Sequence, residues 1–76
     1  MKNFYFTFGS DSGFPYQNTY LIVKAESVNE AIQKFRAKYP DRHKDCVNCA
    51  FWYTEDQWNV SLNSKYYSDG PAEIIE

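Results

Sequence analysis

The residues with the clearest chemical potential are His43, Cys46 and Cys49, which lie at intervals of three, the two cysteines in a Cys-x-x-Cys arrangement. Structural zinc sites use four protein ligands, and the chain has no further cysteine or histidine to complete one. A thioredoxin-like redox site places its cysteine pair between a strand and the following helix, whereas this pair runs into a strand-like segment. We therefore interpret Cys49 as a core residue and Cys46 as incidental, and expect no metal or other cofactor.

The glycine-containing segment 9–13 has superficial likeness to two catalytic motifs. Its central residue is Asp11 rather than the serine of a hydrolase nucleophile elbow, and no Gly-Lys-Ser/Thr follows as in a P-loop. A turn that needs glycine conformations is the simpler interpretation. General acid–base catalysis uses a titratable group tuned by burial next to a nucleophile, whereas the single histidine lies in the most charged, solvated segment. The sequence therefore predicts a protein that is not an enzyme.

Composition argues for one small globular domain over residues 1–76, with an unusual aromatic content of 20%. A chain of this length buries only about 60% of the surface that its unfolded form exposes. Some rings must then either substitute for missing core volume or reach the surface as a contact site. The net charge of −2, without long basic or acidic runs, disfavours a general nucleic-acid binder.

Hydrophobic periodicity predicts the elements that position these residues. Segment 3–8 alternates with three phenylalanines on one face, which is typical of a half-buried strand, and segment 19–25 is also strand-like. Ser27 and Glu30 fit a capping box that starts a helix, which Pro40 ends near Tyr39. The apolar run 48–53 predicts a third strand, central in the sheet and covered at least partly on both faces.

A second capping box, from Thr54 to Gln57, predicts a short helix to about residue 62 or 65, with Trp58 and Leu62 on its apolar side. Segment 72–75 is a plausible last strand. The order ββαβαβ predicts an α+β domain, with a mixed three- to four-stranded sheet and helices packed mainly on one face. No segment resembles a signal peptide or a membrane span, so we expect a cytoplasmic protein without membrane contact.

The residues expected to contact a partner lie in three segments. Phe14 and Tyr16 belong to a long loop, Arg42 and His43 to a charged loop, and Trp52 to the third strand. These types are favoured at protein interfaces, although the first loop could instead fold back over the core. The alternative hypothesis is a nucleic-acid-binding module in which the aromatic face of segment 3–8 stacks on bases. Self-association into a homo-oligomer is also compatible with the sequence.

A set of short motifs spans nearly the whole chain: Phe4-Tyr5-Phe6-Thr7-Phe8-Gly9, Phe14-Pro15-Tyr16, Glu30-Ala31, Phe35, Tyr39-Pro40-Asp41-Arg42, Asn48-Cys49-Ala50-Phe51, Tyr53 and Trp58. In these motifs the chain resembles a group of short proteins without assigned function that are encoded in prophages and mobile elements of Gram-positive bacteria. This resemblance implies a phage or mobile-element accessory protein. Small proteins of such elements often bind a host protein, so we expect a non-enzymatic protein that acts by protein–protein binding and inhibits a host defence or another host process.

Overall fold

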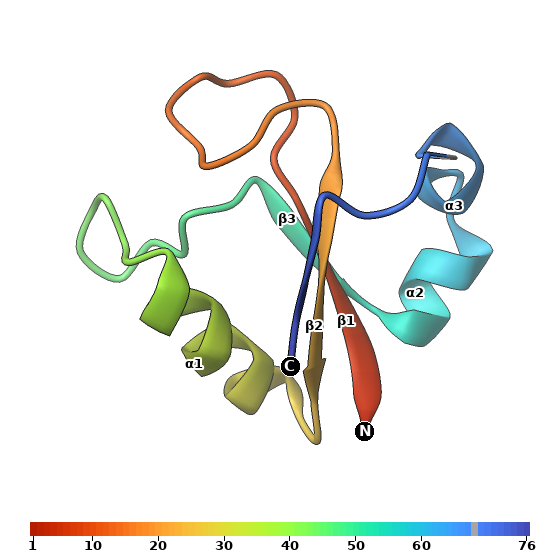
Figure 1. Ribbon diagram of the computed structural model, residues 1–76, viewed down its shortest axis with the longest axis horizontal. Coiled ribbons are helices and arrows are strands. Elements are labelled where there is room, and N and C mark those ends of the chain that lie inside the picture. The colour runs from red at the N-terminus through yellow and green to blue at the C-terminus, as the bar shows by residue number, and fades with distance from the viewer. Residues whose placement is uncertain (68) are drawn as a thin grey trace.

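A four-stranded mixed sheet flanked by helices forms the fold (Figure 1). The computed structural model describes residues 1–67 and 69–76. In chain order the elements are β1 (Lys2–Thr7), β2 (Tyr20–Ala25), α1 (Val28–Lys38), β3 (Phe51–Thr54), α2 (Glu55–Val60), α3 (Asn63–Tyr66) and β4 (Glu73–Ile75). The strands lie in the order β3-β1-β2-β4, with β1 antiparallel to β2 and β3, and β4 parallel to β2. This confirms the predicted α+β class and the mixed sheet.

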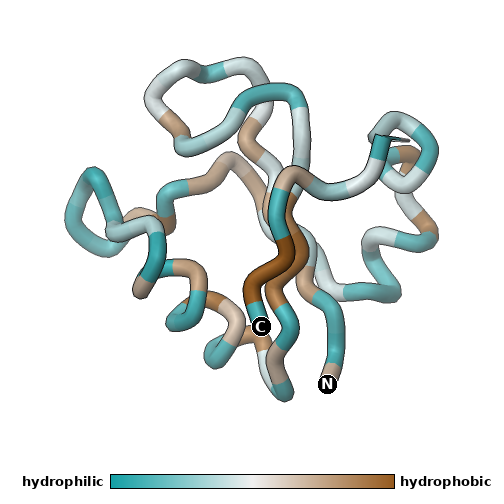
Figure 2. The backbone as a smooth tube through the Cα atoms, in the orientation of Figure 1, coloured by the Kyte–Doolittle hydropathy of each residue, from teal (hydrophilic) through white to brown (hydrophobic). Residues whose placement is uncertain are grey.

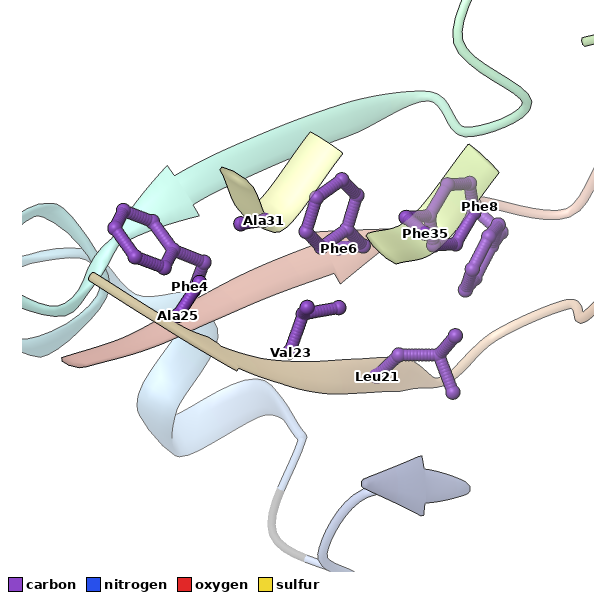
Figure 3. Close-up of a cluster of buried hydrophobic side chains, with 8 residues drawn as sticks. All are labelled: Phe4, Phe6, Phe8, Leu21, Val23, Ala25, Ala31 and Phe35. Carbon is purple, nitrogen blue, oxygen red and sulfur yellow. The ribbon is translucent and has the colours of Figure 1, made fainter. Parts of the chain in front are cut away.

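One face of the sheet carries the main core. Phe4, Phe6 and Phe8 point to this face as the alternating pattern predicts, and all three are buried. They pack with Leu21 and Val23 of β2 beneath α1, whose Phe35 ring stacks on Phe6 at a centroid distance of 4.6 Å (Figure 3). Figure 2 shows hydrophobic residues along the paired strands and a hydrophilic loop after α1. Full burial of each such side chain stabilises the fold by about 1.5–3 kcal/mol.

The opposite face carries a second, aromatic core. Trp58 of α2 is buried against it, and its ring stacks on Tyr5 with centroids 4.5 Å apart and planes only 3° apart. Tyr20 lies 4.8 Å from the same indole, and Tyr53 packs edge-on against it. The helices therefore lie on both faces of the sheet, and the prediction that they pack mainly on one face is wrong. The outward side chains of β1 and β2 are rings too large to leave in water, so α2 covers them.

The two predicted helix starts differ in detail. At Thr54 the capping box is complete, because its hydroxyl accepts from the Gln57 amide and the Gln57 side chain accepts from the Thr54 amide. At the start of α1 the Ser27 hydroxyl accepts from the Glu30 amide as predicted. The Glu30 carboxylate, however, accepts from the backbone amide of Glu26 and not from that of Ser27. The predicted start of α1 is therefore confirmed, but the predicted hydrogen bond from the Ser27 amide to the Glu30 side chain is not formed.

Two predictions about the second half of the chain are wrong. Segment 48–53 was expected to form a central strand, but β3 is an edge strand with exposed rings, because β1 occupies the middle of the sheet. The predicted second helix breaks at Ser61, whose hydroxyl donates to the Trp58 carbonyl at 2.9 Å. The break gives the element order ββαβααβ, and the Leu62 side chain is exposed to solvent. Of the helices in the described residues, none is long and apolar enough to cross a membrane.

Candidate partner-binding site

An open hollow of about 450 Å³ lies where the two long loops meet the start of β3. We call it the loop pocket. Its walls come from the loop between β1 and β2, the segment between α1 and β3, and β3 itself. The lining residues are Phe14, Arg42, His43, Cys46, Val47, Asn48, Cys49, Ala50 and Trp52. The fold thus brings together side chains from three segments that are distant in the sequence.

Four of the five residues predicted to contact a partner line the loop pocket: Phe14, Arg42, His43 and Trp52. Phe14 also packs against the main core, with its ring 6.4 Å from that of Phe8, so it supports the loop and forms a pocket wall. The indole of Trp52 is 40% exposed. The pocket therefore combines partly exposed aromatic surface with the side chains of Arg42 and His43.

Tyr16 is the predicted residue that does not line the pocket. Its hydroxyl donates to the Glu73 carboxylate at 3.3 Å, and the Tyr39 hydroxyl lies within 3.3 Å of it. The hydrogen bond with Tyr39 is the largest cause of a raised pKa at Tyr16, with burial adding to it. Tyr16 therefore holds the loop against α1 and β4 and positions the nearby Phe14. This contact corresponds to the alternative in which the first loop folds back over the core.

Local chain geometry explains how Arg42 and His43 reach the rim. The α1 helix ends at Tyr39, before Pro40, and an ion pair of 3.0 Å between Arg36 and Asp41 fixes the exit of the chain. A tight turn follows, in which the Cys46 amide donates to the His43 carbonyl at 3.1 Å and Asp45 adopts a positive φ of 61°. Aspartate tolerates this left-handed conformation better than most residues. The turn exposes the side chains that precede it.

The Arg42 guanidinium lies against the backbone of the first loop. A Cβ atom at Gly13 would collide with it, so glycine at that position allows the close approach. Within the described residues, Arg42 forms no ion pair. A guanidinium beside aromatic surface suits an acidic or planar group from outside the chain. Asn48 also lines the pocket, and its Oδ1 is buried without a hydrogen-bond partner among the described residues.

The thiols in the pocket differ in exposure. Cys49 packs against the main core, and burial raises its pKa from 9.0 to about 12, so it stays protonated at neutral pH. Because the thiolate is the reactive form, Cys49 is a poor nucleophile and a poor metal ligand there. Cys46 is exposed. Across the described residues, no three histidine, cysteine or acidic side chains come close enough together to hold a metal ion.

The structure also adds one residue that the sequence pattern did not single out. Phe51 begins β3 and is 65% exposed, because the sheet ends at this strand. Only its assignment to an edge strand reveals this, and the apolar run suggested the opposite. The rings suggested for stacking on bases, in contrast, are covered: Phe4, Phe6 and Phe8 by α1 and its loops, and Tyr5 by Trp58.

No protein-family model matches this chain, and neither does a curated protein or a solved structure.

Proposed function

We propose that this protein acts without catalysis, by binding another protein through the loop pocket and the exposed rings beside it. The observation that supports this most strongly is the convergence of Phe14, Arg42, His43 and Trp52 on one hollow. These four residues come from three separate segments of the sequence, and their types are favoured at protein interfaces. Binding hot spots are typically such clusters, in which aromatic side chains and arginine meet in a pocket from which the bound partner excludes water.

The physical argument for a partner is that large aromatic side chains stay exposed outside the core. Trp52 and Phe51 keep 40% and 65% of their surface exposed on a domain that has little apolar material to spare. A domain of this size has about 3–5 kcal/mol of net stability, so rings left outside the core are a cost unless a partner covers them. Arg42, which forms no ion pair with any residue that the structure describes, gives the same surface a preference for an acidic or hydrogen-bond-accepting partner.

The resemblance to proteins of prophages and mobile elements supports an accessory role, with a host protein as the target. Binding there would inhibit a host defence or another host process. This role needs only a stable surface and no catalytic group. Such a mechanism is consistent with a Cys49 thiol that stays protonated and a histidine that lies in an exposed turn.

The experiment compares captured proteins between matched variants. Wild type, a Phe14→Ala/Arg42→Glu double variant and a Val60→Ala control are immobilised, and proteins bound from a host-cell lysate are quantified by mass spectrometry. Val60 is 88% exposed on α2 and lies outside the pocket, so it controls for loss of exposed apolar surface. We expect at least one protein to bind wild type and the control equally and the double variant at least tenfold less. Identical capture by all three would refute the proposal.

A titration with single-stranded oligonucleotides at low salt tests the alternative that the protein binds nucleic acid instead of another protein. We expect no binding at high micromolar concentration, because the covered sheet faces offer no stacking platform and the chain is weakly acidic. Binding that falls steeply with added salt and is lost in Arg42→Glu would replace the protein partner by a nucleic acid.

A further inference from the structure

The outer edge of β3 is an unprotected strand edge. Within the described residues β3 pairs with β1 alone, so the backbone N–H and C=O groups on its other side face outward without a strand. Proteins usually protect such edges with lysine, proline or a bulge, because the groups are a template for another strand. The strand Phe51–Thr54 has the sequence FWYT and contains neither lysine nor proline. Its exposed rings lie on opposite faces of the sheet, Phe51 on one and Trp52 on the other.

The opposite edge of the sheet is protected by comparison. The β4 strand has only three residues and follows Pro71. Its Glu73 carboxylate is held by Tyr39 and Lys38, and the Lys34 ammonium donates to the Glu76 carbonyl just beyond the strand. Short strands, proline and charge all limit pairing at an edge. A pairing partner should therefore be found at β3.

Charges at the two ends of β3 favour a second copy of the chain as that partner. Arg42 lines the pocket at the start of the strand, and the adjoining turn holds Lys44 and the exposed Asp45, which leaves a net positive charge there. Glu55 and Asp56 directly follow the strand. None of these five side chains forms an ion pair within the described residues. In an antiparallel pair of β3 strands, the basic end of one copy lies beside the acidic end of the other, whereas parallel pairing would bring like charges together. The attraction acts over roughly a Debye length, about 10 Å at 0.1 M salt.

We propose that the protein forms a symmetric dimer in which the β3 edges of two copies pair antiparallel and extend the sheet across the interface. Phe51 and Trp52 lie at the new seam and become buried on its two faces. The dimer goes beyond the proposed partner-binding function and is measured on purified protein. Both proposals use Trp52 and Phe51, so a dimer and a partner would compete for these rings. The two are told apart by the measurement: the dimer is a property of the purified protein, and the partner is found by capture from lysate.

The first test is the mass in solution, measured by sedimentation equilibrium between about 1 and 500 µM, a range in which mass action should reveal association. We expect the mass to rise from 9.0 kDa toward twice that value. Phe51→Lys should weaken association at least tenfold, since it places a charge on the edge, while its 65% exposure lets the monomer fold. The matched control Ile74→Lys, at a residue 50% exposed on β4, should change it less than twofold.

The second test reverses the charges at one end of β3 at a time and leaves the core untouched. In an antiparallel pair each reversal puts like charges side by side, whereas a parallel pair has like charges side by side with or without it, so loss of association in each variant alone tests the antiparallel arrangement. Glu55→Lys/Asp56→Lys makes both ends of β3 basic, and Arg42→Glu/Lys44→Glu makes both ends acidic. We expect each variant alone to be monomeric and their mixture to form a heterodimer. A wild type that stays at 9.0 kDa throughout would overturn the proposal. So would a dimer that Ile74→Lys breaks and Phe51→Lys does not, or a mixture that stays monomeric.

Discussion

Three side chains converge on the Glu73 carboxylate, and this cluster ties the last strand to α1 and to the loop that carries Phe14. The Tyr39 hydroxyl donates to Glu73 Oε1 at 2.6 Å, the Tyr16 hydroxyl donates to the same oxygen at 3.3 Å, and the Lys38 ammonium pairs with Oε2. The Glu73 side chain is only 17% exposed. Because β4 has three residues, the cluster is a main attachment of the C-terminal segment. We therefore choose Tyr39→Phe, which removes one hydroxyl and keeps the ring.

The expected cost follows from the geometry of the bond. Hydrogen bonds to charged groups contribute about 1.5–3 kcal/mol, and removing a donor leaves a partly buried acceptor less well satisfied. Lys38 and Tyr16 still contact Glu73, so the low end of the range, about 1.5 kcal/mol, should apply. For a domain of this size each kcal/mol lowers the melting temperature by about 4–8 °C, which gives a fall of roughly 6–12 °C.

The assay is thermal and urea unfolding followed by circular dichroism, with Tyr66→Phe as the matched control. Tyr66 is exposed, and among the described residues its hydroxyl forms no hydrogen bond. Its loss should change the free energy of unfolding by less than about 0.5 kcal/mol. If Tyr39→Phe is no more destabilising than Tyr66→Phe, the Glu73 cluster does not stabilise the fold as argued.

Three further outcomes follow from the second core and the buried thiol. Trp58→Ala removes the ring stacked on Tyr5 and should cost about 3–5 kcal/mol, enough to unfold much of the protein at 25 °C; a wild-type urea midpoint would contradict a second core. At about pH 8, a thiol reagent should modify Cys46 rapidly and Cys49 only in denaturant, because burial raises the pKa of Cys49 to about 12; rapid reaction of both would contradict this. Stability should fall as pH rises above 9. The reason is that the unfolded chain releases the Cys49 proton near its pKa of 9.0, whereas the folded chain, in which the pKa is raised to about 12, retains it. Burial also raises the pKa of Tyr20 above 10.0 in the folded chain, which has an effect of the same sign. Equal urea midpoints at about pH 8 and pH 10.5 would refute that sign.

Local signals in the sequence were sufficient for the first half of the fold. The alternating phenylalanines placed β1 and its buried face, and Ser27 and Pro40 bracketed α1. These features depend on residues close together in the chain. Position within the sheet does not, and an apolar run such as FWYT is equally compatible with a buried strand and with an edge that another molecule covers.

In the candidate site, too, local sequence predicted the residue types but not how the fold arranges them. Residue type alone selected Phe14, Arg42, His43 and Trp52, but their meeting in one hollow depends on how the two loops pack beside β3. The role of Tyr16 was beyond local patterns, because it depends on Glu73, 57 residues further along the chain. The break after Trp58 likewise depends on a side-chain hydrogen bond that competes with the helix at Ser61.

The central claim is that this protein works through the side of the molecule that holds Trp52. A photo-crosslinking amino acid placed at Trp52, and at Val60 as a control on the opposite face of the sheet, tests it most directly in cells that contain the target. We predict a discrete adduct at position 52, heavier than a dimer of the chain, and none of that mass at position 60. The same adducts at both positions, or only self-adducts at position 52, would contradict the claim.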